Sequence, residues 1–387
     1  MYVLHHFENY NIKEVNRMPW REKLKNNIST VEQLKKHIDL STKERKKIQK
    51  IIEKHPMSIS QYYMSLIQEK GSYDHDPIKR MIVPQIEELN LEGSYDPSGE
   101  EQNTKMPGLQ HKYAQTALIL ATNRCAAYCR HCFRKRLVGL PSEEILRRLN
   151  DAIRYIAKHK EINNVLISGG DPFILPTGVI KKLLEKLSVI DHLNFIRFGT
   201  RVPVVFPERI LEDIEFVDIL KENSHKKRRI YVVTQFNHPR EITEKSTEAV
   251  SRLIESGIIV NNQTVLLKGV NDDSEILSEL LNKLVSIGAN PYYVFQCRPV
   301  KRVKYRFQVP LYRGYFIVEE AKKGLNGHSK RFRYVMSHRT GKIEVLGIID
   351  DSFIFKYHQA KNPKNLGRIF TRRVSKTAGW LDDLDSR

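Results

Sequence analysis

The stretch that decides the fold runs from Ala117 to Cys132 and reads ALILATNRCAAYCRHC. It begins with a short apolar run of β-forming residues and continues into three cysteines, Cys125, Cys129 and Cys132, with three residues between the first pair and two between the second. Three thiolates on one loop can bind three irons of a [4Fe–4S] cluster. No fourth cysteine lies near in the sequence, so the fourth iron would keep an open coordination site.

Two other interpretations of the cysteines remain open. The loop is also compatible with a structural zinc site or with three buried cysteines of no special role. A structural zinc site normally has four protein ligands. His131 would have to be the fourth ligand, and its place between two of the cysteines makes that geometry cramped. The spacing therefore favours the iron–sulfur cluster.

Outward from this stretch, apolar runs alternate with polar, often helical segments at roughly 30–35-residue spacing, which is typical of βα units. We predict strands at Ala117–Ala121, Asn164–Ile167, Phe195–Phe198, Ile230–Thr234, Val260–Leu267 and Tyr292–Gln296, with helices that include Ser142–Lys158, Thr177–Leu187 and Ser246–Ser256. Chemistry in a parallel barrel belongs at the carboxyl ends of the strands, and polar motifs follow most of these runs there. The pattern predicts an α/β fold built as a partial (β/α)6 barrel.

The ends of the chain have other patterns. Residues 1–108 are predicted to form a helical N-terminal region, with helices at Thr42–His55 and Ile59–Glu69, and residues 109–315 form the barrel. Residues 316–387 are predicted to form a small α+β segment. It comprises a helix at Val318–Leu325, a β-rich stretch at Arg333–Val345 with a turn at Thr340-Gly341, and a basic, extended tail from Lys361 onward.

Composition excludes several classes of protein. The chain has 387 residues and a formal charge of +20, with mixed charges and 40% hydrophobic residues, so it is not disordered. No apolar run approaches the ~20 residues of a membrane span, and Met1–Trp20 lacks the apolar core of a secretory signal. Four cysteines are too few for a disulfide scaffold, which favours a reducing compartment and the cytoplasm. The net positive charge is compatible with a nucleic-acid-binding protein. The lysines and arginines are dispersed along the chain, however, which favours solvated surfaces.

The cysteine loop resembles the signature of the radical S-adenosylmethionine (SAM) superfamily, and CAAYCRHCFRKR resembles the lysine 2,3-aminomutase family in particular. Further matching strings are SGGDPF (168–173), RFGTRVPVVFPERI (197–210), FNHPREIT (236–243), NQTVLLKGVND (262–272) and PYYVFQC (291–297). The resemblance runs from about Pro77 to about Gly347.

The resemblance implies a radical mechanism. The open iron binds the amino and carboxylate groups of SAM, and one electron from the cluster, delivered by an external donor, cleaves the sulfonium. The 5′-deoxyadenosyl radical then abstracts hydrogen from the substrate. Residues implied on the SAM side are Gly169, Gly170, Asp171, His131, Arg201, His238 and Gln263. Glycines after a strand also allow close approach to a ligand, although a Gly-Gly-Asp alone is usually a plain turn.

The family also uses pyridoxal 5′-phosphate (PLP), which needs a lysine for its Schiff base. Lys342, after Thr340-Gly341, lies where the family has its PLP lysine, although the glycine-rich stretch is reduced here. Tyr113 matches a family position near PLP. Arg134 matches the arginine that holds the substrate α-carboxylate, for which its planar fork is suited, although a contact with the anionic cluster is an alternative. The implied reaction moves an amino group from C2 to C3 of an L-amino acid.

The sequence departs from lysine-specific members at the substrate's distal group. Those members hold the distal ammonium with two aspartates; here Arg298 occupies the first position, and 333–339 contains no acid. A cation would repel an ammonium, so we expect an acidic or neutral substrate such as glutamate, unless Arg298 turns away and another carboxylate binds lysine. A zinc site of some members is not expected either, because Asp272 replaces its first cysteine and no cysteine follows Cys297.

The sequence therefore predicts an isomerase, a SAM- and PLP-dependent 2,3-aminomutase of a small amino acid. Alternatives are an enzyme that makes β-lysine for attachment to a translation factor and a basic radical SAM protein acting on nucleic acid. A homo-oligomer is implied by the family, and the N-terminal helical region is a candidate for that contact.

Overall fold

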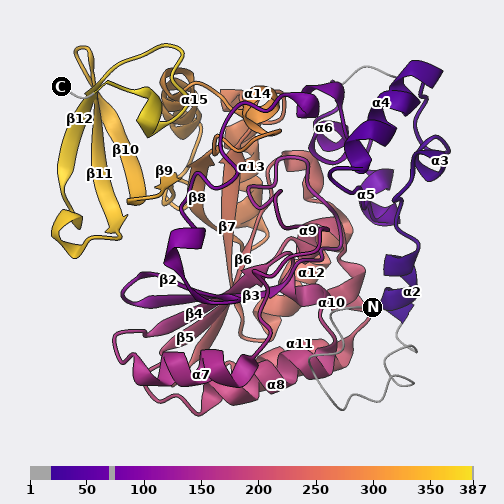
Figure 1. Ribbon diagram of the computed structural model, residues 1–387, viewed down its shortest axis with the longest axis vertical. Helices are drawn as coiled ribbons and strands as arrows, with labels where there is room; N and C mark the ends of the chain where they lie inside the picture. Colours follow the sequence, from indigo (N-terminus) through magenta and orange to yellow (C-terminus); the bar gives the residue numbers. More distant parts are fainter. Residues whose placement is uncertain (1–18, 69–74, 386–387) are drawn as a thin grey trace.

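The computed structural model describes residues 19–68 and 75–385, and its centre is one mixed sheet of twelve strands in the order β1 to β12 (Figure 1). Seven successive strands pair in parallel: β3 (Thr116–Thr122), β4 (Asn164–Gly169), β5 (Phe195–Gly199), β6 (Arg229–Thr234), β7 (Ile259–Leu266), β8 (Asn290–Gln296) and β9 (Arg333–His338). The first six are the predicted strands, and each end lies within two residues of its predicted place.

Helices connect the parallel strands, as βα units require. They are α7 (Leu149–Lys158), α8 (Thr177–Ser188), α9 (Val202–Val205), α10 (Glu208–Leu211), α11 (Ile214–Asn223), α12 (Glu244–Glu255), α13 (Ser274–Ser286), α14 (Lys304–Phe307) and α15 (Leu311–Lys323). The sheet runs from β1 to β12 without closing on itself. The predicted partial (β/α)6 barrel is confirmed, and the division into three regions stays a prediction.

The predicted helix Ser142–Lys158 is too long. Helix α7 begins only at Leu149, and Arg148 at its N-cap offers no side-chain hydrogen bond. The backbone N–H of Leu146 instead donates to the carbonyl of Leu120 in β3, at 2.9 Å. An amide committed to a strand cannot also start a helical ladder, so residues 142–148 stay irregular.

The N-terminal region is helical, as predicted, but its helices are short. They are α2 (Pro19–Lys25), α3 (Val31–Leu34), α4 (Thr42–Ile52), α5 (Gln61–Ser65) and α6 (Pro77–Ile82). The short 3-10 helices η2 (Ile86–Leu89) and η3 (Glu101–Asn103) lead into β1 (Thr104–Met106) and β2 (Leu109–Tyr113). The predicted end of the second helix at Glu69, and most of the segment tested for a secretory signal, lie outside the described residues.

The C-terminal part contains more sheet than predicted. The β-rich stretch is β9 and β10 (Gly341–Ile349), but β11 (Ser352–Ala360) and β12 (Ile369–Arg373) follow. The tail from Lys361 is therefore not simply extended: it turns through η6 (Pro363–Asn365) and pairs antiparallel with β11. The missed signal was the run Ile369-Phe370-Thr371, because β-branched and aromatic residues favour strands.

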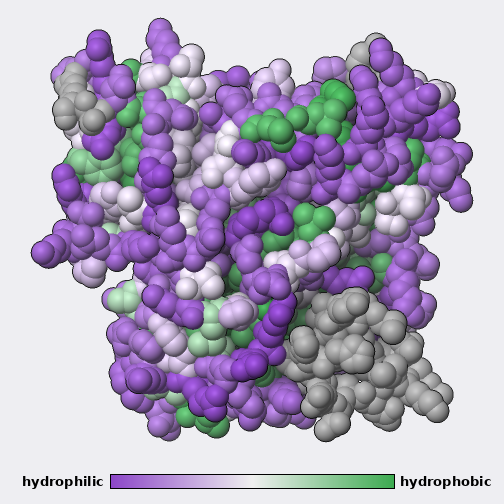
Figure 2. All heavy atoms as spheres, in the orientation of Figure 1, coloured by the Kyte–Doolittle hydropathy of each residue, from purple (hydrophilic) through white to green (hydrophobic). Residues whose placement is uncertain are grey.

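Buried side chains from both halves of the chain form one continuous core between the sheet and its helices. Hydrophilic side chains cover most of the face in Figure 2, with scattered apolar patches. Among the described residues, no helix is long and apolar enough to cross a membrane.

Candidate active site

A cavity of about 340 Å³ lies where the parallel strands end. Its lining includes most of the residues singled out from the sequence: Tyr113, Cys125, Cys129, His131, Cys132, Arg134, Gly169, Gly170, Asp171, Arg201, Gln263, Arg298 and Lys342. His238 is not part of this lining. Its Nδ1 accepts the backbone N–H of Arg240 at 3.1 Å and so caps η5 (Pro239–Glu241).

The N-terminal region holds the cysteine loop by its backbone. Asn27 donates through Nδ2 to the carbonyl of Ala126 at 2.6 Å. The amide of Tyr128 donates to the carbonyl of Ser58, and the amide of Arg130 to the carbonyl of Met81, both at 2.8 Å. This region therefore shapes the candidate cluster site, a role that the sequence did not suggest.

A buried carboxylate, Glu88, ties the loop down further. Its side chain is fully buried and forms ion pairs with Arg130 at 2.6 Å, Lys135 at 2.5 Å and Arg306 at 3.3 Å. Burial alone would raise the pKa of Glu88, but these cations hold it far below its usual range. Burial lowers the pKa of Lys135 to about 7 although Glu88 opposes the shift. Three cations on one carboxylate leave this layer beneath the loop positively charged, which suits an anionic cluster.

The three cysteines of the loop line the same cavity, as the ligands of a [4Fe–4S] cluster must. Burial, followed by the charge of Cys129, raises the pKa of Cys132 to about 11. Within residues 19–68 and 75–385, no three His, Cys, Asp or Glu side chains converge as ligands of one metal ion do. In a [4Fe–4S] cluster each thiolate binds a separate iron, so the sulfurs need only surround the same cavity.

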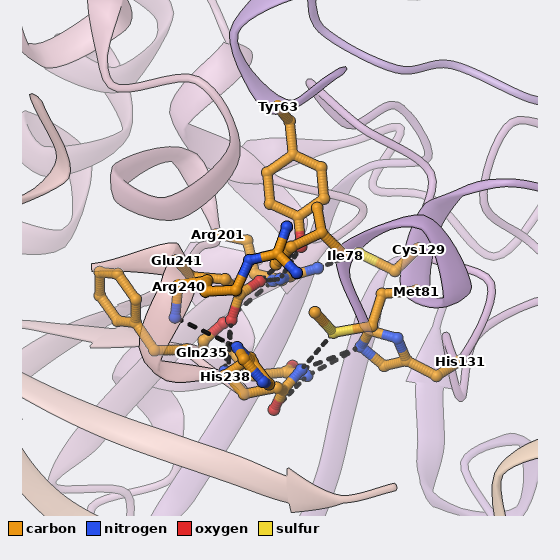
Figure 3. A network of polar contacts seen from close by, with 12 residues as sticks. Tyr63, Ile78, Met81, Cys129, His131, Arg201, Gln235, His238, Arg240 and Glu241 are labelled. Atoms are coloured by element: carbon orange, nitrogen blue, oxygen red, sulfur yellow. Dashed lines mark hydrogen bonds and ion pairs between the residues drawn. The ribbon is translucent and has the colours of Figure 1, made fainter. Parts of the chain in front are cut away.

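Figure 3 shows a polar network around one of these thiols. Arg201 donates through Nη1 to the sulfur of Cys129 at 2.6 Å and through Nη2 to Glu241 at 2.5 Å. On the other side, the Nε2 atoms of His131 and Gln235 lie 3.1 Å apart. Burial lowers the pKa of His131 well below its usual value, so its ring is neutral near pH 7.

The segment Gly169-Gly170-Asp171 contacts the backbone that leads into the cysteine loop. A Cβ on Gly169, whose φ is +115°, would lie 2.3 Å from the carbonyl oxygen of Thr122, and one on Gly170 would lie 2.1 Å from that of Arg124. The amides of Gly170 and Asp171 donate to these same oxygens, at 2.5 and 2.7 Å. The glycines thus permit close backbone pairing beside Cys125.

The carboxylate of Asp171 is fully engaged by the chain. It accepts from the Thr200 hydroxyl at 2.6 Å, the amide of Phe173 at 3.0 Å and the amide of Arg201 at 2.7 Å. The side chain therefore orders the start of α9 rather than facing a ligand.

Arg134 is also engaged. Its Nε and Nη2 donate to Glu100 at 3.0 and 2.7 Å, and its Nη1 donates to the hydroxyl of Ser168 at 3.0 Å. Burial opposes ionisation of Glu100, but Arg134, followed by Arg136 and Arg298, lowers the pKa of Glu100 to about 2. The fork that the sequence assigned to a substrate carboxylate thus already holds a carboxylate of the chain.

Lys342 lies on β10 beneath two aromatic rings of β8. Its Nζ is 4.2 Å from the ring centroid of Tyr293 and 5.8 Å from that of Phe295. Burial, followed by the charges of Arg197, Arg298 and Lys112, lowers the pKa of Lys342 to about 7. Among the described residues this amine has no hydrogen-bond or ion-pair partner. A pKa of about 7 leaves a large share of this amine uncharged near pH 7, and covalent attachment of an aldehyde cofactor requires the uncharged form, so Lys342 fits PLP.

Arg298 follows β8 and stacks on Phe133, with its guanidinium carbon 3.7 Å from the ring centroid. Its Nη1 is buried and has no hydrogen-bond partner in the described parts of the chain. Burial lowers the pKa of Arg298 to about 10, which still leaves it charged. The cavity thus contains a cation with an unused donor.

Several lining residues were missed in the sequence. Glu100, Lys112 and Arg197 all line the cavity, and burial lowers the pKa of Lys112 to about 8. Tyr113, singled out by resemblance, lies next to Lys112, and burial raises its phenol pKa well above the usual range. No spacing rule identifies isolated acids and bases that only the fold brings together, so no signal was available for them.

Asp272 and Cys297, where the zinc site of other family members is not expected, have contacts or burial of another kind. Asp272 accepts the amide of Gly269 at 2.6 Å and pairs with Arg313 at 3.0 Å. Cys297 is buried, with 1% of its surface exposed.

Three thiols on the loop after the first parallel strand of an open barrel define the class of protein. Residues 119–281 match the family "Radical SAM superfamily". The chain is 41% identical over 346 residues to "Putative L-lysine 2,3-aminomutase" of Aquifex aeolicus (strain VF5), covering 89% of this chain and 92% of that protein. It is 38% identical over 316 residues to "L-lysine 2,3-aminomutase" of Clostridium subterminale, covering 81% and 73%. It is 37% identical over 292 residues to "Glutamate 2,3-aminomutase" of Clostridioides difficile (strain 630), covering 75% and 67%.

The chain belongs to the lysine 2,3-aminomutase family of radical SAM enzymes. It is therefore an isomerase of the family that includes lysine and glutamate 2,3-aminomutases. Membership implies a [4Fe–4S] cluster, SAM and PLP as cofactors, a small-molecule substrate and a reductant.

Proposed function

We propose that the chain is a PLP-dependent 2,3-aminomutase of an acidic L-amino acid, with glutamate as the first candidate. The observation that carries this proposal is the buried, unpartnered Nη1 of Arg298 in the cavity. A buried cation without a partner is costly, and a substrate carboxylate would supply the missing acceptor. The relative named glutamate 2,3-aminomutase is consistent with such a substrate.

The acids of the cavity support the same choice. Of the described residues that line it, Glu100 and Asp171 are the two carboxylates. Glu100 is paired with Arg134 and Arg136, and Asp171 accepts three hydrogen bonds from its own neighbourhood. Neither is available to a distal ammonium, so lysine would enter a cavity of uncompensated positive charge.

The proposed roles of the residues follow from their positions. Cys125, Cys129 and Cys132 hold the cluster, and Lys342 holds PLP. Tyr113 flanks the PLP, while Gly169, Gly170 and Asp171 shape the wall beside Cys125. His131 and Gln263 lie on the SAM side, and Arg298 binds the distal carboxylate. When bound, the cluster and SAM supply the radical and PLP supplies a carrier for the migrating nitrogen.

Arg134 needs a different role from the expected one unless Glu100 moves. In the structure it neutralises Glu100, and its charge also acts on Cys125. Arg134 could bind the substrate α-carboxylate only if the carboxylate of Glu100 left its guanidinium group. We therefore propose Arg134 as the residue that anchors Glu100 beside the cluster, and the α-carboxylate as a competitor for the same fork.

The test is anaerobic turnover of reconstituted enzyme with SAM, PLP and dithionite. Glutamate, lysine, glutamine and alanine are offered singly, and β-amino acid products are measured by mass spectrometry. β-Glutamate as the main product supports the proposal. β-Lysine as the main product overturns the acidic substrate, and turnover without added or bound PLP overturns the cofactor assignment. A reaction without SAM serves as the blank.

A further inference from the structure

Arg201, which the family resemblance implied on the SAM side, is held by contacts within the chain. It follows β5, and its side chain is 10% exposed. Its guanidinium points at the sulfur of Cys129 in Figure 3, at 2.6 Å from Nη1. Its Nε donates to the carbonyl of Gln235 at 3.0 Å, and its Nη2 to Glu241 at 2.5 Å. Nearly every donor of Arg201 is thus used within the chain, and one of them is used on a cysteine sulfur.

A second set of contacts fixes this orientation. Tyr63, from α5, donates to Glu241 Oε1 at 2.5 Å, and both side chains are fully buried. The other oxygen of Glu241 accepts the amides of Asn237 at 2.5 Å and His238 at 3.0 Å. Glu241 is therefore immobilised from three directions. Because Arg201 is paired with an immobile carboxylate, its Nη1 is held on Cys129 rather than left to reach for a ligand.

We propose that Arg201 tunes the iron–sulfur cluster: it donates a charge-assisted hydrogen bond to the sulfur of Cys129 and so makes the cluster easier to reduce. Tyr63 and Glu241 are positioning residues that hold it there. The network joins the N-terminal helical region to the cluster, which gives that region a part in the first electron transfer.

The direction of the effect follows from charge. In the reductive step one electron passes from an external one-electron donor to the oxidised cluster, which gains one negative charge. A positive hydrogen-bond donor on a ligand sulfur stabilises the more negative state and raises the reduction potential. Without Arg201 the same donor would reduce a smaller fraction of the protein.

This inference goes beyond the proposed function, because it does not depend on PLP or on the substrate. The cluster potential is measured without SAM, PLP or amino acid. A wrong substrate assignment would leave it unchanged, so failure of one idea is distinguishable from failure of the other.

The experiment is an anaerobic redox titration of the reconstituted full chain, in which electron paramagnetic resonance measures the reduced cluster. R201Q removes the charge and keeps a polar side chain of similar length. R201K keeps the charge but lacks the planar fork that reaches Cys129 and Glu241 together. R240Q is the matched control, because Arg240 lies in the same network but donates to Asp76 and to the carbonyl of Leu66. Iron and sulfide contents and the melting temperature are recorded for each variant.

At the wild-type midpoint potential, we expect the ratio of reduced to oxidised cluster to fall about tenfold in R201Q, which is a shift of about 59 mV for one electron. This ratio should fall by less in R201K than in R201Q, and in R240Q it should equal the wild-type ratio. An unchanged midpoint in R201Q overturns the proposal, as does an equal shift in R240Q. If R201Q takes up no cluster, the midpoint potential of R201K is the test. A midpoint potential of R201K equal to that of the wild type then overturns the proposal.

Discussion

Glu100 holds both the Nε and the Nη2 of Arg134, at 3.0 and 2.7 Å, in a bidentate pair within the wall of the cavity. The pair joins the segment before β1 to the chain just after Cys132. Arg136 reaches the second oxygen of Glu100 at 2.9 Å, so two cations of the cysteine loop share one acid. The loop is thereby fixed from outside before any iron binds.

The first prediction concerns the stability that Glu100 confers. E100Q leaves the buried Arg134 without a counter-ion, whereas Arg136 keeps its ion pair with Glu144 at 2.7 Å; breaking a buried pair typically costs about 3–5 kcal/mol. We expect the free energy of unfolding of the apo-protein to fall by about 3 kcal/mol near pH 7. Urea unfolding followed by circular dichroism measures the difference.

The pH dependence of that difference follows from the pKa. The pKa of Glu100 is about 2 in the folded chain and about 4.3 when unfolded, so the folded state favours the ionised form. Its contribution is therefore fully present above about pH 5 and is lost as the pH falls towards 2. The difference in the free energy of unfolding between wild type and E100Q should become smaller as the pH falls through this range. A gap that is constant from pH 7 to pH 3 would mean that the ion pair is not its source.

A second prediction concerns Lys342, whose pKa of about 7 is set by burial and neighbouring cations. Only the uncharged amine attacks the PLP aldehyde, so the rate of covalent capture should rise about tenfold per pH unit up to pH 7 and then flatten. Borohydride reduction followed by peptide mass spectrometry locates the attached group. K342M should lose the label, whereas K361M, an exposed lysine, should keep it. A label that persists on another lysine in K342M would contradict the assignment.

Arg298 gives a third prediction, because its stacking on Phe133 leaves Nη1 free for a carboxylate. Loss of a hydrogen bond to a charged group costs about 1.5–3 kcal/mol, or about 10- to 150-fold in kcat/KM. We expect R298M to lose this much with glutamate and to lose little with a neutral amino acid. With glutamate, R298K, which keeps the charge, should have a kcat/KM between those of R298M and the wild type. Equal losses for acidic and neutral substrates would argue that Arg298 only supports the fold.

The sequence predicted the framework of the fold well, because β-forming apolar runs at a regular spacing specify strands locally. It also identified the three cysteines, whose spacing is a local property of one loop. Residues that matter only through tertiary contacts were beyond such reasoning. Glu88, Glu100 and Tyr63 are ordinary acids and an ordinary tyrosine in the sequence, and only folding brings them under the cysteine loop. Resemblance likewise placed Arg201 near SAM, and only the contacts of its side chain assign it to Cys129.

The last prediction concerns Gly170, whose amide donates to the carbonyl of Thr122. In G170A the new Cβ would lie 2.1 Å from the carbonyl oxygen of Arg124, which is a backbone atom and cannot rotate away. The strand end and the residue before Cys125 must then separate, which displaces the first cysteine from the other two. We expect G170A to bind substantially less iron after reconstitution and to unfold at lower temperature, as measured by iron analysis and calorimetry.

The control is G257A, because a Cβ on Gly257 meets no atom within 4 Å, although the φ of Gly257, unlike that of Gly170, is positive, at +75°. G257A therefore carries backbone strain without the collision, and strain of this kind costs about 1–2 kcal/mol. It should lower the melting temperature but leave iron binding intact. If G170A and G257A lose stability equally and both retain full iron, the close contact of Gly170 with the carbonyl of Arg124 is not needed for cluster binding.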